Sequence, residues 1–431
     1  MLSVLVACIG GVHCCCECVN TLCLEWLLTK KLLLATCLLT PKRLINAHTI
    51  MANFTEGPMA SALFGGSSSS QQATFGYPAG VTLVDLAPDH LKPHIDKHWL
   101  NFPPVNPMWH YVLGLIYIFL LFFSVTGNGL VVYLFNKHAP IRTPSNFLVV
   151  NLALSDLIML TTNCPFFVYN CFAGGQWSFS IGYCHVYAAL GAVTGVCSIW
   201  TLACISADRY NIICNGFNGP KLTKGKATMM AAFCWGIAIG CAAPPFFGWG
   251  GYSLEGILTS CSFDYLSQDI GTITYNLFMF IFDYCCPLMV IIGSYAMIIK
   301  AIAAHESAMR AQAAKMNVKS LRTQEANDQR AEIRIAKTAM FNIALWIGCW
   351  TPYAAITLQG SLGDFTGLKP LTTTLPALLA KSASCYNPFV YAIGHPKFRQ
   401  AMTVHVPWFC VHEAEPKSDN QSTSTHEEEK A

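Results

Sequence analysis

Seven apolar runs constrain this chain more than any other feature of its sequence. Each is about 20 to 28 residues long, the length that an α-helix needs to cross roughly 30 Å of hydrocarbon. Charged residues make up only 11% of the chain, whereas a soluble domain has about 25%. The pattern predicts an all-α membrane protein with a bundle of seven transmembrane helices. The runs occupy residues 108–135, 146–169, 184–213, 227–248, 274–300, 333–360 and 371–393.

Basic residues in the loops predict how the bundle is oriented. The segments 136–145, 214–226 and 301–332 contain lysine and arginine, whereas 170–183 and 249–273 contain neither. Basic loops tend to remain in the cytoplasm. We therefore expect the N-terminus outside the cell and the C-terminus inside it.

The two ends of the chain differ from the bundle. In residues 1–50 an apolar stretch is interrupted by acidic and basic residues, so we expect an artefactual or unstructured extension there. Residues 51–107 have the composition of an extracellular tail, and Asn53 begins a glycosylation sequon within it. Residues 406–431 are polar and rich in serine and threonine, which is typical of a disordered cytoplasmic tail.

A lysine in the middle of the seventh run is the most informative single residue. Lys381 stands in the stretch LLAKSASCYNPFVY, about ten residues from either end of the run, or roughly 15 Å deep. An ammonium group at that depth costs several kcal/mol unless it is paired or neutralised. One interpretation is a neutral lysine or one that faces a water-filled cavity. The other is a Schiff base with a buried aldehyde, because desolvation favours the neutral, nucleophilic amine.

A protonated Schiff base needs a nearby anion, and the apolar runs contain few carboxylates. Asp156 and Asp283 lie within runs, and Glu255 lies in the loop 249–273. A disulfide from Cys184, at the start of the third run, to Cys261 in that loop is topologically possible in an oxidising compartment. Such a bond would hold Glu255 over the bundle.

Four motifs show a family resemblance over about residues 85–415. The chain resembles the animal opsins, which are rhodopsin-like G-protein-coupled receptors, and the lysine six residues before Asn387 separates opsins from other such receptors. The stretches HPKFR and AKMNVKSLR resemble arthropod visual opsins of the middle- to long-wavelength group. The motifs are Arg142-Thr143-Pro144-Ser145-Asn146, Asp208-Arg209-Tyr210, Cys349-Trp350-Thr351-Pro352-Tyr353 and Asn387-Pro388-Phe389-Val390-Tyr391.

The resemblance implies a light-sensing receptor with 11-cis-retinal, or a hydroxylated relative, bound to Lys381 as a Schiff base. Vertebrate visual opsins have a glutamate counterion where this chain has Tyr187, so the resemblance to invertebrate relatives moves the counterion to Glu255. Asp283 is the second candidate. The chromophore pocket is expected to include Trp350, Tyr187 and Tyr353, and the resemblance supports the disulfide between Cys184 and Cys261.

The resemblance also implies an activation switch near the cytoplasm. Arg209 is expected to bind its neighbour Asp208 and to reach Glu332, which lies about 30 Å along the sixth helix from the kink at Pro352. Two buried polar residues of the switch, Asn128 and Asp156, also fit simple hydrogen bonding between helices. The switch residues are Asp208, Arg209, Tyr210, Glu332, Asn387, Pro388, Tyr391, Asp156 and Asn128.

The inner face is expected to bind a Gq-type heterotrimeric G protein in visual phototransduction. Residues 108–405 form the receptor domain, and residues 395–405 are expected to lie along the membrane as an amphipathic eighth helix. Phosphorylation of the tail would recruit arrestin. The expected location is the plasma membrane of the rhabdomeric photoreceptor. The candidate phosphorylation sites are Ser418, Ser422, Thr423, Ser424 and Thr425.

Three other functions share part of this pattern. A receptor for a diffusible ligand has no need of Lys381, and a light-driven pump would place donor and acceptor carboxylates along one helix. A retinal photoisomerase would keep Lys381 but would not need Asp208-Arg209-Tyr210 or the basic segment 301–332. No hydrolytic triad, phosphate-binding loop, zinc pattern or nucleic-acid-binding block is visible, so we predict a non-enzyme with no metal site and no nucleic-acid partner.

Overall fold

Six helices are long and apolar enough to cross a membrane in the part of the chain that is described. This is a computed structural model that describes residues 77–216, 219–315 and 324–409. The first four spans are α6 (Pro107–Lys137), α7 (Pro144–Phe172), α8 (Ile181–Asn215) and α9 (Lys224–Ala242). The fifth comprises α10 (Ile270–Met279), η7 (Phe280–Cys285) and α11 (Cys286–Lys315), and the sixth is α12 (Gln324–Ser361).

The seventh span is interrupted and therefore does not appear as one long helix. It comprises α13 (Pro370–Ser382), a 3-10 turn η8 (Ala383–Cys385) and α14 (Tyr386–Gly394), which follow one another without a gap. The seven-helix fold predicted from the sequence is thus confirmed. The expected run 227–248 agrees with the fourth candidate span, Lys224–Phe247, within which α9 ends at Ala242 and the prolines that follow start the short η6 (Pro244–Phe247).

Local sequence signals explain where several spans begin. The hydroxyl of Thr143 accepts the N–H of Asn146 at the start of α7, and Ser180 accepts that of Tyr183 at the start of α8. Asp269 caps α10 in the same way. These side chains satisfy amide groups that have no partner within the first turn.

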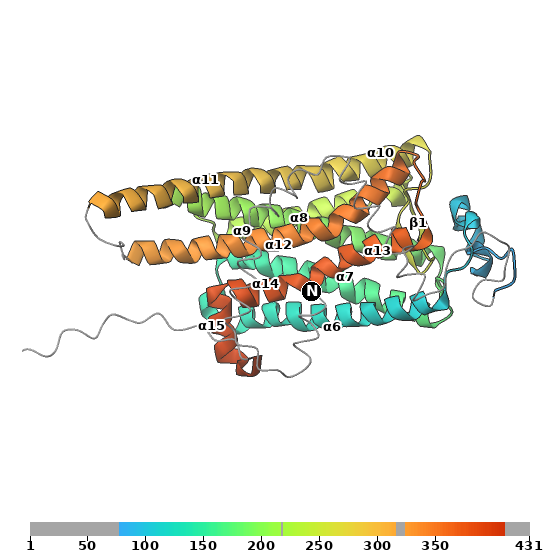
Figure 1. Ribbon diagram of the computed structural model, residues 1–431, viewed down its shortest axis with the longest axis horizontal. Coiled ribbons are helices and arrows are strands. Elements are labelled where there is room, and N and C mark those ends of the chain that lie inside the picture. Colours follow the sequence, from blue (N-terminus) through green and yellow to red (C-terminus); the bar gives the residue numbers. More distant parts are fainter. Residues whose placement is uncertain (1–76, 217–218, 316–323, 410–431) are drawn as a thin grey trace, which may run out of the picture. The chain divides into compact units, whose positions relative to one another are not determined.

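Helix α8 lies near the centre of the bundle and contacts spans on either side of it in the sequence. Helix α8 packs on α7, α9 and α11, while α6 packs on α7 and α12 on α13. Figure 1 shows α11 and α12 extending beyond the ends of the other helices. Close approach requires glycine at Gly195, since a Cβ there would lie 2.7 Å from the Trp350 ring.

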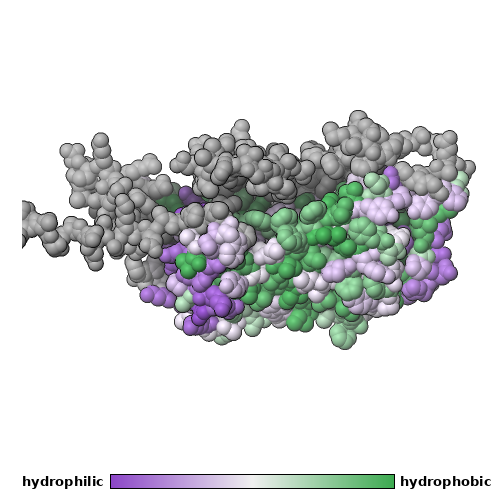
Figure 2. Space-filling model, turned by 90° about the horizontal axis from the view of Figure 1, so that it is seen from below, coloured by the Kyte–Doolittle hydropathy of each residue, from purple (hydrophilic) through white to green (hydrophobic). Residues whose placement is uncertain are grey.

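The outward side of the bundle is apolar, as a lipid-facing surface must be. On α6 the side chains of Phe119 and Phe122 are 60% and 59% exposed. Figure 2 shows a hydrophobic band across the middle of one face, with hydrophilic residues gathered at both ends. Such a band matches the layers of a bilayer and its interfaces.

One end of the bundle is closed by a hairpin and by the segment that precedes α6. Strand β1 (Tyr252–Glu255) pairs antiparallel with β2 (Ser260–Phe263), so that Glu255 lies opposite Ser260. The short helices η1 (Val84–Leu86) and η3 (Lys97–Asn101) share one apolar cluster with this hairpin, and so do Leu91 and Ile95, which flank η2 (Lys92–His94). In that cluster Trp99 and Leu254 are fully buried.

The other end of the bundle carries a short helix after the seventh span. Helix α15 (Pro396–His405) is followed by η9 (Pro407–Phe409), and η4 (Ala139–Ile141) lies between α6 and α7. Phe398 and Met402 of α15 pack with Leu134 of α6 in one apolar cluster. Figure 1 shows α15 turned across the direction of α14. The eighth helix therefore exists at the predicted position, and its location along a membrane stays a prediction.

Candidate functional site

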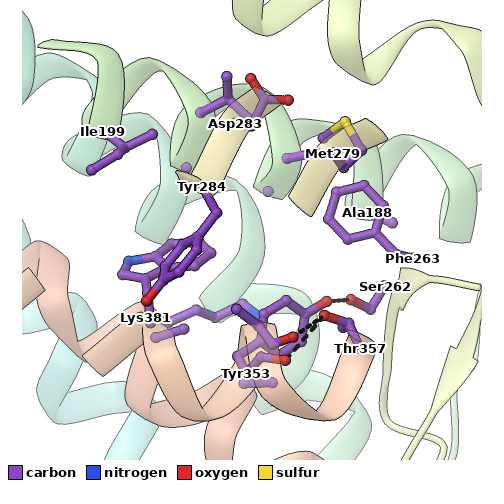
Figure 3. A pocket seen from close by; sticks show the side chains of 18 of the residues that line it. Ala188, Ile199, Ser262, Phe263, Met279, Asp283, Tyr284, Tyr353, Thr357 and Lys381 are labelled. Carbon is purple, nitrogen blue, oxygen red and sulfur yellow. Dashed lines mark hydrogen bonds between the residues drawn. The ribbon is translucent and has the colours of Figure 1, made fainter. Parts of the chain in front are cut away.

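A cavity inside the bundle contains the lysine that the sequence singled out. Its walls come from α7, α8, β2, the fifth span, α12 and α13, and they are mainly apolar. Lys381 of α13 is one of the residues that line this cavity, and Figure 3 shows its side chain there. None of the ion pairs in the described part of the chain includes Lys381. The cavity thus brings an amine without an ion-pair partner among the described residues to a mainly apolar space.

Glu255 is the carboxylate whose charge interacts with that of Lys381. It ends β1 and is 2% exposed, and neither carboxylate oxygen has a hydrogen-bond partner among the described residues. Burial raises the pKa of Glu255 to about 7, and the nearby Lys381 opposes that rise. A buried carboxyl group with no partner is costly. The arrangement suits a cationic group placed between Glu255 and Lys381.

Two contacts hold the hairpin that carries Glu255, one at β2 and one at the turn between the strands. Cys184 of α8 and Cys261 of β2 form a disulfide, with their Cα atoms 5.5 Å apart. The N–H of Ile257 donates to Thr374 Oγ1 on α13 at 3.2 Å. The turn between the strands therefore lies against the same helix as Lys381.

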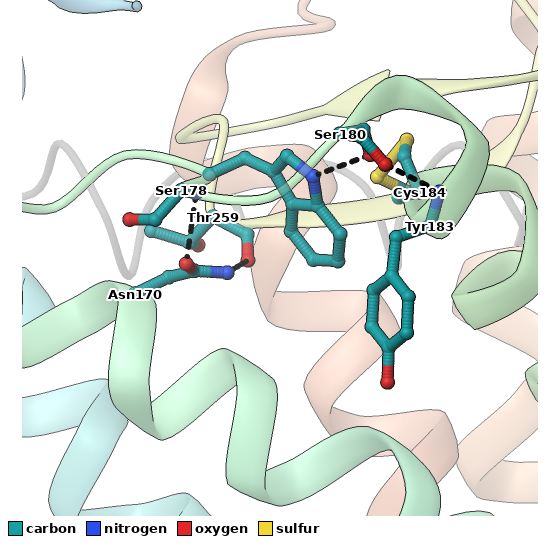
Figure 4. The surroundings of a disulfide bond; sticks show 8 residues. Asn170, Ser178, Ser180, Tyr183, Cys184 and Thr259 are labelled. Atoms are coloured by element: carbon teal, nitrogen blue, oxygen red, sulfur yellow. Dashed lines mark hydrogen bonds between the residues drawn. A yellow bond between two sulfur atoms is a disulfide. The ribbon is translucent and has the colours of Figure 1, made fainter.

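Hydrogen bonds around Asn170 fix the chain beside the disulfide. The Asn170 amide donates to the Thr259 carbonyl at 3.1 Å and accepts the N–H of Ser178 at 3.1 Å. Figure 4 shows the hydrogen bonds from Asn170 to these two residues, with the disulfide at Cys184 on the other side of an indole ring. Asn170 thus joins α7 to the turn before β2 and to the loop that precedes α8. Sequence analysis did not single out this residue.

Aromatic residues form part of the cavity wall. Trp350 and Tyr353 of α12 line it, as expected, and the Trp350 ring stacks on Trp346 with centroids 5.2 Å apart. The Tyr353 hydroxyl bonds to Ser262 of β2 (Figure 3). Tyr187 is not among the lining residues of the cavity; it is fully buried and interacts electrostatically with Glu255.

Asp283, the second counterion candidate, is hydrogen-bonded to Trp200. Its Oδ1 accepts the indole N–H of Trp200 at 3.2 Å, and its Oδ2 has no hydrogen-bond partner in the described part of the chain. Figure 3 shows Asp283 on the wall opposite Lys381, with its carboxylate pointing away from the lysine in that view. The geometry thus favours Glu255 over Asp283.

The switch residues form two clusters. In the first, Arg209 donates to Asp208 beside it and to Glu332 Oε2 at 3.0 Å. Tyr210 follows Arg209 and packs into the apolar cluster around α8 and α12. The expected link between the third and sixth helices is therefore present as a contact, and its role stays a prediction.

The second cluster lies between α6, α7 and the seventh span. Asn387 donates to Asp156, and Asn128 donates to the Ser384 carbonyl at 2.8 Å. The 3-10 turn η8 brings this carbonyl to Asn128, since Ser384 lies within the turn. Pro388 contacts Gly127, where a Cβ would lie 2.9 Å from the proline ring.

Tyr391 extends the seventh span towards α15. It is buried, and its ring lies 6.3 Å from that of Phe398. Several other candidates lie outside the described residues, as does the extension 1–50. They are Asn53, Ser418, Ser422, Thr423, Ser424 and Thr425.

Comparisons with known proteins identify the family. The family described as "7 transmembrane receptor (rhodopsin family)" matches residues 127–391. Compound eye opsin BCRH2 of Hemigrapsus sanguineus is 67% identical over 359 residues, which cover 83% of this chain and 95% of that protein. Compound eye opsin BCRH1 of the same crab is 64% identical over 383 residues, 88% of this chain and 100% of that protein. This chain belongs to the arthropod visual opsins.

A solved structure agrees with the family. The crystal structure of squid rhodopsin has 35% sequence identity and a TM-score of 0.69, and the match covers 75% of this chain and 93% of that one. The opsin is therefore a light-sensing G-protein-coupled receptor that spans the membrane several times, and it is not an enzyme. As an opsin it uses a retinal chromophore and a G-protein partner.

Proposed function

We propose that this opsin holds 11-cis-retinal, or a hydroxylated relative, as a Schiff base on Lys381 and activates a Gq-type G protein in rhabdomeric photoreceptor membranes. One observation supports the attachment most strongly. Within the part of the chain that the structure describes, an amine without an ion-pair partner lines an apolar cavity near a buried carboxyl group that has no hydrogen-bond partner. The residues therefore fit a long apolar aldehyde whose bound form carries a positive charge. Retinal supplies the light absorption and a light-driven change of shape.

Glu255 would balance the positive charge at Lys381. The disulfide at Cys261 and the bond from Ile257 to Thr374 hold its strand in place. Because the carboxyl group is buried, its charge is screened less than a charge in water would be. Glu255 is thus the proposed counterion.

Trp350 would pass a change in the cavity to α12. Its ring lines the cavity two residues before Pro352, which removes one backbone hydrogen bond from the helix. A displaced ring can therefore bend α12 at this point. At the far end of the helix, such bending would separate Glu332 from Arg209 and open the inner face to the G protein.

The terminal parts of the chain complete the proposal. We infer that the N-terminus lies outside, where Asn53 would be glycosylated, and that the serine and threonine residues after 417 are phosphorylated in the cytoplasm to recruit arrestin. The sequence patterns support both inferences.

A spectrum tests the central step. Wild-type protein and Lys381→Ala are expressed, supplied with 11-cis-retinal and compared by dark-minus-light difference spectra. We expect a visible band that light alters in the wild type, and no such band in Lys381→Ala. Mass spectrometry after borohydride reduction should place the adduct on the peptide that contains residue 381. A colourless wild type without an adduct would refute the attachment.

The G protein is assigned by a second measurement. Light-dependent nucleotide exchange is compared on purified Gq-, Gi- and Gs-type proteins with the same pigment. We expect the largest exchange rate with the Gq type. A larger rate with either of the others would contradict that part of the proposal.

A further inference from the structure

Tyr284 joins the cavity wall to the sixth span. It belongs to η7, the π-helical turn in the fifth span, and it lines the cavity. Figure 3 shows its side chain extending from η7 towards the level of Lys381. Its hydroxyl lies 2.6 Å from Thr351 Oγ1 of α12. One phenol thus contacts both the cavity and the helix that is proposed to move.

The direction of this hydrogen bond follows from the number of protons. Thr351 Oγ1 donates to the Ile347 carbonyl at 2.6 Å. A hydroxyl group has only one proton to donate. Tyr284 must therefore donate to Thr351, and the three groups form one directed chain that ends on the backbone of α12.

The chain ends at the point where α12 can bend. Thr351 lies between Trp350, which lines the cavity, and Pro352, which has no N–H to donate to the carbonyl of Gly348. A movement of Trp350 therefore displaces its neighbour Thr351. The same movement would lengthen the bond to Tyr284.

Two other hydrogen bonds link the fifth and sixth spans in the described part of the chain. The Asn276 amide donates to Ser361 Oγ at 2.9 Å, and the Tyr295 hydroxyl donates to the Ala336 carbonyl at 3.3 Å. Their α12 partners, Ser361 and Ala336, lie ten and fifteen residues from Thr351 along the helix. The Tyr284 bond alone among these three adjoins both the cavity and Pro352.

We propose that Tyr284 is a positioning residue that holds α12 against the fifth span in the dark, and that its bond to Thr351 breaks when the receptor opens. This inference rests on the proposed opening of α12. Without the bond, opening would cost less in the absence of any light signal. The open population should then rise about fivefold, the factor expected for one neutral hydrogen bond.

The variant Tyr284→Phe removes only the hydroxyl, and Tyr275→Phe is its matched control. Tyr275 lies on the same span and is fully buried, but its hydroxyl donates to the Cys241 carbonyl on α9 at 2.9 Å. Hydrogen–deuterium exchange of residues 332–345 is measured in the retinal-free protein. We expect faster exchange in Tyr284→Phe, by about fivefold, and no change in Tyr275→Phe.

A double-mutant cycle shows whether Tyr284 acts through Thr351. Thr351→Val should raise the same exchange rate. The double variant should exchange no faster than either single variant, because both substitutions remove the same hydrogen bond. Thr351→Ser keeps the hydroxyl and should resemble the wild type. Equal exchange in Tyr284→Phe and the wild type, or additive effects in the double variant, would refute the proposal.

Basal nucleotide exchange on the G protein provides the functional readout. In the dark it should rise about fivefold in Tyr284→Phe and remain unchanged in Tyr275→Phe. A wild-type pigment that fails to respond to light would refute the proposed function. Hydrogen exchange in the retinal-free protein would still decide the role of Tyr284, so the two failures are distinguishable.

Discussion

Arg209 and Glu332 join α8 to α12 at the end of α8 that lies away from the disulfide. Arg209 Nη1 donates to Glu332 Oε2 at 3.0 Å, and Arg209 Nη2 donates to Asp208 Oδ2. Arg209 is buried, whereas the Glu332 side chain is 40% exposed. Solvent therefore screens part of the attraction. The ion pair holds α8 and α12 in contact at this end of the bundle, and under the proposed function this contact belongs to the closed arrangement.

Replacing Glu332 by glutamine should raise receptor activity in the dark. The neutral amide cannot attract Arg209 as strongly, and an ion pair of this exposure contributes up to ~1 kcal/mol, so we expect a rise of about two- to fivefold. Basal nucleotide exchange measures it. The variant Lys92→Gln is the control. Lys92 belongs to η2, outside the spans, and forms an exposed ion pair with Asp89. A basal rate equal to that of the wild type would show that the pair does not restrain α12.

Replacing Glu255 by glutamine should weaken the protonated form of the retinal linkage. We expect the visible band of the pigment to be lost at a lower pH than in the wild type, because the nearby negative charge that favours protonation is gone. Spectra recorded across a pH titration measure this change. Asp283→Asn is the matched control, because its carboxylate bonds to Trp200. A titration of Glu255→Gln that overlays the wild type would exclude Glu255 as the counterion.

The retinal-free protein should lose stability as the pH rises from about 4.5 to about 7. Burial raises the pKa of Glu255 from 4.5 to about 7, so the folded state holds a proton that the unfolded state releases. The stabilisation is complete below pH 4.5 and is lost as the pH rises through 7, with a size of roughly 3 kcal/mol. Thermal unfolding of the wild type and Glu255→Gln across this range measures the difference. Parallel curves for the two proteins would contradict the prediction.

The sequence predicts the spans well but not how they face one another. Apolar length is a property of the chain alone, so seven spans could be found, and the depth of Lys381 followed from its place in the last of them. The 3-10 turn at Ala383–Cys385 has no comparable local signal. It depends on tertiary contacts, such as that between Asn128 and the Ser384 carbonyl.

Side-chain direction around the cavity was the hardest part to predict. Tyr187 is buried beside Glu255, and its place in the chromophore pocket stays a prediction, whereas Tyr284 lines the cavity without having been singled out. The π-helical turn changes the helical phase in the fifth span, so regular spacing of 3.6 residues does not give the direction of Tyr284. Contacts between distant segments, such as Ser262 with Tyr353, require the folded hairpin.

Removing the disulfide should destabilise the protein and its pigment. The bond closes a long loop between Cys184 and Cys261, with a sequence separation of 77. Loss of such a bond typically costs about 2–5 kcal/mol. We expect Cys184→Ser to unfold at a lower temperature and to bind less 11-cis-retinal. Cys214→Ser is the control, because Cys214 is a half-buried free thiol. Equal melting temperatures for Cys184→Ser and the wild type would contradict the expected anchoring of the hairpin.

His395 should make the start of α15 sensitive to acid. Its Nδ1 accepts the N–H of Phe398 at 3.3 Å, which the ring can do only when neutral. Burial lowers the pKa of His395 to about 4, and the positive charges of Arg209, Lys397 and Arg334 act in the same direction. The cap is therefore complete above pH 6.5 and is lost as the pH falls through about 4.

Hydrogen exchange of residues 396–405 measures this cap. At pH 7 we expect His395→Ala to exchange about fivefold faster than the wild type, as loss of a cap worth ~1 kcal/mol implies. His395→Asn supplies an amide oxygen that can accept the same N–H and does not titrate, so its protection should stay closer to the wild type at pH 7. As the pH falls towards 4, the stability of this segment should drop in the wild type but not in His395→Asn. The same drop in both proteins would assign the acid sensitivity to another group.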